Sequence, residues 1–278
     1  AVILLLRCNT WEYTVNMYIQ IYKTGMLDNL EEKFMKKIFA IIVAFMFTMV
    51  FLSGCGEKIS TDEAFIKDLE AGLEARWDIV DGDNDDNESK EYWESLFNAE
   101  LVKIEKYKAE DFDDKELGQL AKEYIAAIEG GKEALEKHDP ETNYDRFWND
   151  YSPYYGQRTK IFCKINKGGY GLKVSDSKYQ DNFDGLIADG WAVELMENIK
   201  FEKSDDGFTY HSIAKNDSGY DFDYLQFEIL EKNNDGTTVD TTYASVSNWD
   251  NETEREFEFY AGDKTESYEI ISVTSQIK

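Results

Sequence analysis

The spacing of hydrophobic residues changes near residue 200. From about residue 60 to residue 199, apolar side chains recur every three or four positions, which is the spacing of one buried face of an α-helix. From there to residue 278, apolar and polar side chains alternate, as in β-strands with one buried face. We therefore predict an α+β protein of two domains, an α-helical bundle over 60–199 followed by an antiparallel β-sandwich over 200–278.

The first predicted helix spans about 61–78. It begins with the capping box Ser60-Thr61-Asp62-Glu63, in which the serine and glutamate side chains satisfy free backbone N–H groups of the first turn. Its apolar face is made by Phe65, Leu69, Leu73 and Trp77. A shorter helical region over about 175–199 ends the predicted bundle.

Three further helices are predicted between these two. One begins near Ser89, one follows Asp113, and one begins at Asp139-Pro140, an N-cap residue followed by a proline in the first helical position. Glycine is a poor helix former and proline lacks the N–H that the helix needs. We therefore expect Gly130-Gly131 to weaken the third helix and Pro153 to kink or interrupt the fourth.

The strands are predicted from five alternating runs separated by turn-forming residues. The runs are 208–214, 224–230, 237–246, 255–260 and 268–273. The turns are Asn216–Gly219, Asn233–Gly236 and Ala261–Asp263. Short strands at regular spacing without helices between them indicate a small sandwich.

Several segments in this region carry a family resemblance. They are Ala214–Leu225 (AKNDSGYDFDYL), Asn234–Thr237 (NDGT), Ala244–Trp249 (ASVSNW) and Phe257–Phe259 (FEF). Over roughly 205–275 they resemble the FxLYD domain of bacterial surface lipoproteins, although the literal Phe-x-Leu-Tyr-Asp string is absent. The resemblance implies an immunoglobulin-like sandwich behind a helical N-terminal region, as in lipoproteins of Gram-positive bacteria. It implies no catalytic residues.

A basic and then apolar segment precedes the predicted bundle. Met35-Lys36-Lys37 is followed by 15 residues, Ile38 to Leu52, among which Thr48 alone is polar. A helix of that length reaches only about 22 Å, less than the ~30 Å hydrocarbon core of a bilayer. The segment therefore predicts a signal peptide over 35–54 rather than a spanning helix.

The end of this segment, Leu52-Ser53-Gly54-Cys55, resembles the lipobox of bacterial lipoproteins. The resemblance implies that signal peptidase recognises Leu52, Ser53, Gly54 and Cys55, cuts before Cys55, and leaves the Cys55 thiol lipidated. Residues 55–59 would then be a short lipidated tether, and the protein would lie on the extracytoplasmic face of the cell membrane. The alternative is an uncleaved signal anchor that contains a cysteine by chance.

Residues 1–34 precede a complete signal peptide. We expect them to be an over-extended gene start and leave them out of the predicted fold. Met35 is the favoured initiator, with Met26 and Met17 as alternatives.

Composition limits the partners. The chain has 30 Lys and Arg residues against 57 Asp and Glu residues, a formal net charge of -27, which repels phosphate backbones and argues against nucleic acid. Of the three cysteines, Cys8 lies in the prefix and Cys55 is expected to carry lipid. Cys163 alone remains, so we expect no internal disulfide.

Two features of the sequence can be compared with known kinds of functional site, a calcium-binding loop and a catalytic cysteine. The acidic loop Asp81–Glu88 departs from an EF-hand, because Asp86 stands where glycine is needed and Tyr92 where glutamate is needed. A solvated loop is expected there, with weak irregular calcium binding as the alternative. Cys163 would need His138 or His211 as a base, but its apolar neighbours predict a buried helical position.

The four tryptophans Trp77, Trp93, Trp148 and Trp249 are expected in the core, because their spacing matches the buried faces of helices and strands. We predict no catalytic residue, no metal site and no cofactor. The favoured function is a non-enzymatic binding or structural module of the cell envelope, with an envelope protein or a glycan as partner. One alternative is the solute-binding component of a transporter, which should show two α/β lobes. The other is an envelope hydrolase, which would need a cleft with perturbed carboxylates or an activated cysteine.

Overall fold

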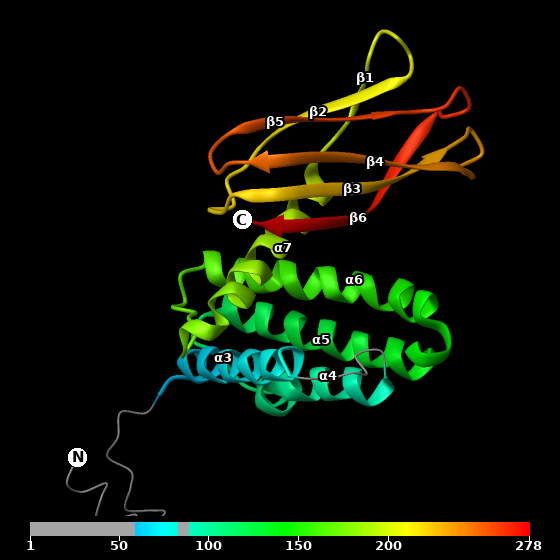
Figure 1. Cartoon of the computed structure of the whole chain (residues 1–278). Helices are drawn as coiled ribbons and strands as arrows, with labels where there is room; N and C mark the ends of the chain where they lie inside the picture. The colour runs from blue at the N-terminus through cyan, green and yellow to red at the C-terminus, as the bar shows by residue number, and fades with distance from the viewer. Residues whose placement is uncertain (1–58, 83–88) are drawn as a thin grey trace, which may run out of the picture. The chain divides into compact units, whose positions relative to one another are not determined.

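The computed structural model describes residues 59–82 and 89–278, which belong to one compact unit, Ile59–Lys278 (Figure 1). In this part of the chain five α-helices are followed by two three-stranded antiparallel sheets, so the α+β class is confirmed. The predicted signal peptide, the lipobox and the loop residues 83–88 lie outside the described residues.

The helices are α3 (Thr61–Val80), α4 (Lys90–Ile104), α5 (Lys115–Lys137), α6 (Pro140–Lys167) and α7 (Gln180–Asn198), with short 3-10 helices η1 (Glu105–Lys108) and η2 (Ser177–Tyr179). The predicted N-cap at Ser60 is present, and Ser89, near which the second helix was expected to begin, caps α4; each hydroxyl accepts a backbone N–H of its first turn at 3.1 Å. Asp139 caps α6 as predicted, whereas α5 is capped by Asp114, the residue after the predicted Asp113. None of these helices is long and apolar enough to cross a membrane.

Neither Gly130-Gly131 nor Pro153 interrupts its helix. Helix α5 runs through Gly130 and Gly131, because these glycines are sites of close packing: a Cβ on Gly130 would lie 2.2 Å from the Tyr154 ring. Helix α6 runs through Pro153, which is exposed, so water can replace the lost backbone hydrogen bond. The non-helical residue within α6 is instead Asn143, at φ -156° and ψ 75°.

A buried ion-pair network joins four helices of the bundle. Glu100 of α4 is fully buried and accepts two hydrogen bonds from Arg158 of α6, at 2.7 and 3.2 Å. It also accepts the Tyr124 hydroxyl of α5 at 2.6 Å and lies 3.3 Å from the Arg76 guanidinium of α3. Removing one partner of a buried charge cluster leaves the others uncompensated, so Glu100 fixes how these helices pack.

The strands are β1 (Glu202–Lys203), β2 (Thr209–Lys215), β3 (Phe222–Lys232), β4 (Thr238–Trp249), β5 (Glu254–Tyr260) and β6 (Ser267–Ile277). They form sheets of order β1-β2-β5 and β4-β3-β6. All five predicted strands are present, β1 was not predicted, and β6 extends four residues beyond its predicted end at residue 273. Aromatic side chains pack between the sheets, as in the Phe227–Phe257 and Tyr210–Tyr268 pairs with centroids 5.0 and 5.6 Å apart, which makes the arrangement sandwich-like.

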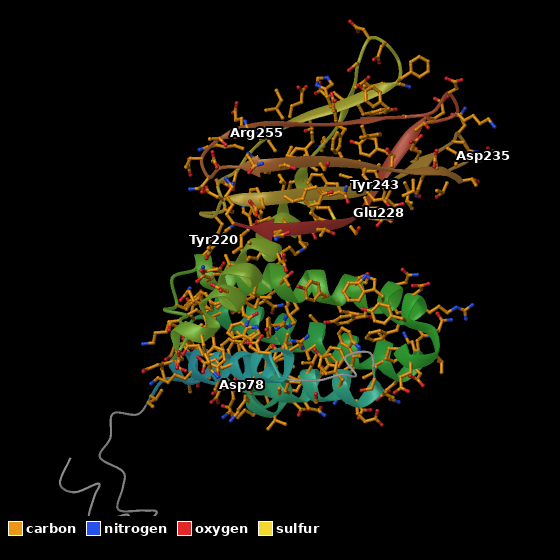
Figure 2. The ribbon with its side chains drawn as sticks, in the orientation of Figure 1. Asp78, Tyr220, Glu228, Asp235, Tyr243 and Arg255 are labelled. Atoms are coloured by element: carbon orange, nitrogen blue, oxygen red, sulfur yellow. The ribbon has the colours of Figure 1, made fainter. Side chains whose placement is uncertain are left out.

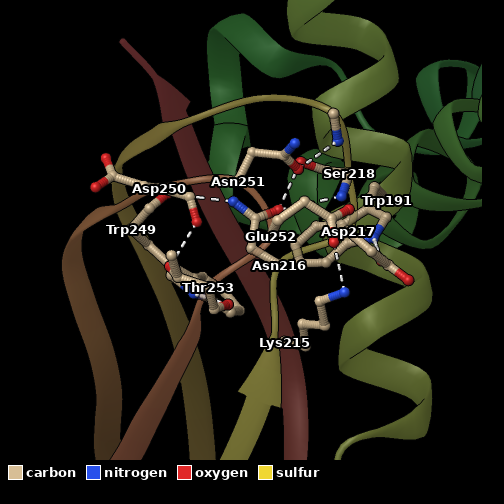
Figure 3. Close-up of polar contacts among 11 residues, drawn as sticks. Trp191, Lys215, Asn216, Asp217, Ser218, Trp249, Asp250, Asn251, Glu252 and Thr253 are labelled. Carbon is tan, nitrogen blue, oxygen red and sulfur yellow. Dashed lines mark hydrogen bonds and ion pairs between the residues drawn. The ribbon is translucent and has the colours of Figure 1, made fainter.

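The turn between β2 and β3 is organised by one buried side chain (Figure 3). Asn216 is fully buried, and its amide donates to the carbonyls of Tyr220 and Trp249 at 2.8 and 3.2 Å. Its side-chain oxygen accepts the N–H and the hydroxyl of Ser218 at 3.1 and 2.7 Å. Asn216 therefore ties this turn to the end of β4.

Helix α7 packs against both α6 and the sandwich. A Cβ on Gly190 would lie 2.2 Å from the Thr159 carbonyl oxygen, so the α6 and α7 backbones approach as closely as a glycine allows. On the other side, the Trp191 indole stacks on Phe222 at 5.5 Å and donates to the Asp217 carboxylate at 2.7 Å. A single cluster of buried apolar side chains includes residues of the helices and of both sheets.

The close approach of α6 and α7 predicts opposite effects for two glycine substitutions. Gly190→Ala should lower the free energy of unfolding by about 1–3 kcal/mol, because the two helices must separate. Gly156→Ala, on α6, should raise it by about 0.5–1 kcal/mol, because the added methyl would meet only Val193, at 3.6 Å, and glycine is costly inside a helix. Urea denaturation measures both, and equal effects would contradict this packing.

The turn at Asn216 predicts a second stability effect. Asn216→Ala should cost about 2–3 kcal/mol, because the buried Trp249 carbonyl loses this donor and Ser218 loses the acceptor that holds the turn. Asn234→Ala, at an exposed position of the β3–β4 turn, is the matched control and should change stability by less than about 0.5 kcal/mol. A cost at Asn216 no larger than that at Asn234 would refute the anchoring role.

Candidate functional site

A groove of about 890 Å³ lies between α6, α7 and the β4-β3-β6 sheet. Its helical side is lined by Trp148, Tyr155, Val193 and Met196, among others. Its sheet side is lined by Glu228 of β3 and by the run Ile271–Ser275 of β6. In Figure 1, β6 is the strand of its sheet that runs beside α7, and these two elements are in contact.

The run from Ile271 to Ser275 shows how β6 meets the groove. Side chains along a strand point alternately to opposite faces of the sheet, so a groove over one face would be lined by every second residue. Here five consecutive residues line it, from both faces. The groove therefore follows the edge of β6, which is the last strand in its sheet.

Asp189 sets the spacing between helix and strand at the Ser275 end of this run. Its carboxylate accepts the Ser275 hydroxyl of β6 at 2.6 Å and the Tyr155 hydroxyl of α6 at 2.8 Å. Burial, together with this carboxylate, raises the pKa of Tyr155, so the phenol keeps its proton and donates. One side chain of α7 thus holds both walls of the groove.

The groove carries more acidic than basic side chains. The acidic residues are Glu123, Asp189, Glu197 and Glu228, and the basic residues are Lys160 and Lys164. Lys160 pairs with Glu197 at 2.5 Å. Glu228, labelled in Figure 2, accepts the Ser272 hydroxyl of the neighbouring strand at 2.9 Å. The groove is therefore polar, acidic and partly prearranged by internal hydrogen bonds.

Cys163 is buried, as the sequence predicts, and faces α7 near Gly190. Burial raises the pKa of its thiol, which disfavours the nucleophilic thiolate. The two histidines have carboxylate neighbours: His138 lies 3.3 Å from Asp150, and His211 lies 3.3 Å from Glu256. The charged groups that act on Cys163 include neither histidine.

The tryptophans divide between core and groove. Trp77 and Trp249 are buried, and Trp93 is partly buried against the core, as predicted. The expectation is wrong for Trp148, which is 37% exposed and lines the groove. Trp148 follows the helical spacing of Phe147 and Tyr151, but it points away from their buried face.

The remaining predicted site residues belong to the lipobox and to the acidic loop. Leu52, Ser53, Gly54 and Cys55 lie outside the described residues, as do six of the eight residues of the acidic loop. Within residues 59–82 and 89–278, no group of three or more His, Cys, Asp or Glu side chains is arranged to hold a metal ion.

The groove residues themselves were not identified from the sequence. Asp189 and Ser275 are 86 positions apart, and no local pattern marks either as a partner of the other. The one signal in the sequence lies in β6, which contains the polar side chains Ser272, Thr274 and Ser275. A strand packed on both sides would be more apolar than this.

Comparison of the chain with family models, with curated proteins and with solved structures gives no match. The groove, its chemistry and the signal-like segment of the sequence are therefore the basis for a proposed function.

Proposed function

We propose that this protein is a lipoprotein, held through Cys55 on the extracytoplasmic face of the cell membrane, that binds another component of the cell envelope without catalysing a reaction. The groove beside β6 is the binding site in this proposal. The groove is the observation that supports the proposed binding function, because ligands commonly bind in concave sites of several hundred Å³ with a few well-placed polar groups.

The anchor rests on the sequence from Met35 to Cys55, in which basic residues, a short apolar run, small residues and a cysteine occur in the order of a lipoprotein signal. Two or three acyl chains on one residue anchor a protein stably, since each buried methylene contributes ~0.8 kcal/mol. The predicted tether, residues 55–59, then keeps the helical region close to the membrane surface.

The sandwich is part of the same proposal. We assign the β-rich part to an immunoglobulin-like domain of the FxLYD type that follows the helical bundle. Supporting this assignment, the turn residues that carry the resemblance organise the β2–β3 corner through Asn216, and two antiparallel sheets pack through aromatic side chains. Sandwiches of this kind serve as interaction modules in many proteins, which is an analogy of fold.

The anchor is tested by Cys55→Ala. This change should abolish incorporation of a palmitate analogue, because no acyl chain can be attached. Cys163→Ala is the matched control and should leave labelling unchanged. Persistent labelling of the Cys55 variant would refute the proposed anchor.

The binding site is tested by site-specific photocrosslinking in cells. A photoreactive residue at Thr274, exposed in the groove, should yield discrete crosslinked species. The same residue at Glu256, exposed on the outer face of β5, is the control and should yield none of them. Identical patterns from the two positions would mean that the groove is not the binding surface.

A further inference from the structure

Building on the proposed function, we propose that the partner segment is an extended polypeptide with basic side chains, which adds to the β4-β3-β6 sheet as a further strand along β6. The groove residues of α6 and α7 cover the outer side of this segment. The partner is thus recognised through its backbone as well as its charge.

The edge of β6 supplies the backbone recognition. An edge strand presents N–H and C=O groups of alternate residues on its free side, and an added strand satisfies them. Because the groove is lined by consecutive residues of β6, it includes this free side, and at Glu228 of β3 it also reaches over a face of the sheet.

The composition of β6 differs from that of a protected edge. Exposed edges are commonly guarded by charged residues, above all lysine, or by proline. The eleven residues of β6 contain one charged side chain, Glu269, and no lysine or proline. By contrast, four of the seven residues of β5, an edge strand of the other sheet, are charged. By composition the β6 edge is therefore less guarded than β5, and a one-residue bulge at Ile271 interrupts its regular pairing with β3.

The dimensions fit one strand. At about 3.3 Å per residue, the five residues that line the groove would pair with about 16 Å of extended chain. A volume of about 890 Å³ is large enough for a short peptide with its side chains and too small for a folded domain. The wall formed by α6 and α7 limits the access of anything wider.

The acidic charge of the groove favours basic side chains in the partner segment. Four carboxylates against two lysines, one of which is paired with Glu197, give an acidic lining. The whole chain carries a net charge of -27, which steers cationic segments toward the protein. A glycan would gain nothing from a strand edge and would need aromatic platforms, but among the groove residues Trp148 alone is an exposed large aromatic.

The test uses the full chain, purified in detergent, and fluorescein-labelled peptides of eight alternating valine and lysine residues. Fluorescence anisotropy measures the dissociation constant. We expect the lysine peptide to bind below about 1 mM and at least tenfold more tightly than the same peptide with glutamate in place of lysine.

Backbone pairing is tested with two N-methylated forms of the lysine peptide, one methylated at the valines and one at the lysines. An added strand donates backbone N–H groups to β6 from alternate residues, that is, from either the valines or the lysines. Methylation of that set should therefore lower the affinity at least tenfold, and methylation of the other set should leave the affinity unchanged. Equal affinities of the two forms would overturn the strand-pairing proposal.

The site is tested with the double variant Glu123→Gln/Glu197→Gln, which should weaken binding of the lysine peptide by about three- to tenfold at low salt. Glu254→Gln/Glu256→Gln, on the outer face of β5, removes the same charge and should leave binding unchanged. Equal weakening by both variants would show that the attraction is nonspecific and would overturn the proposed site.

The outcomes also separate this inference from the proposed function. Crosslinking at Thr274 in cells, together with no binding of the lysine peptide, would leave a binding groove but refute a basic strand as its ligand. Binding of chitotetraose without binding of peptide would refute it in the same way and point to a glycan. Binding of a second copy of the chain at the groove, detected as a dimer that Thr274→Pro abolishes, would replace the peptide with a self-interaction.

Discussion

The close approach of α6 and α7 at Gly190 is the constraint on which the shape of the binding surface depends. With no Cβ at this position, α7 lies directly against the Thr159 carbonyl, while Trp191, the next residue, stacks on Phe222 and bonds to Asp217 in the sandwich. Because two adjacent residues of one helix determine both contacts, the distance between α6 and the sheet is fixed. The width of the groove follows from it.

A groove of fixed width is useful only if its walls are rigid. Helix α6 is held in the bundle by the Arg158–Glu100 pair, and Glu100 also bonds to Tyr124 and lies beside Arg76. Buried charges of this kind add little net stability compared with apolar packing, but they disfavour alternative helix arrangements because each would leave a charge unpaired. The opposite wall is fixed by Asp189, which bonds to Tyr155 and Ser275. The groove thus exists before any ligand binds, which lowers the entropic cost of binding.

The sequence predicted those parts of the fold that depend on local interactions. Helix boundaries followed from caps such as Ser60 and Asp139, and strands followed from alternation between turn residues. Tertiary packing was not predictable in the same way: Gly130 lies in close contact with Tyr154, and α6 continues through the exposed Pro153. The groove was not predictable, since it combines residues of α6, α7, β3 and β6 and since the spacing of Trp148 matches that of core residues on the same helix.

The unguarded edge of β6 and the helices beside it are best understood together. A free strand edge with a single charged residue would be a liability in a protein held on a membrane surface, as proposed for this one, because two such edges pair readily. In this protein the edge lies inside a groove whose other wall is helical, and in the proposed binding mode that wall restricts access to a single extended chain. The acidic lining and the net charge of -27 further disfavour another copy of the same protein and favour a basic segment. The same helices that shield the edge from self-association therefore define which ligands it can accept.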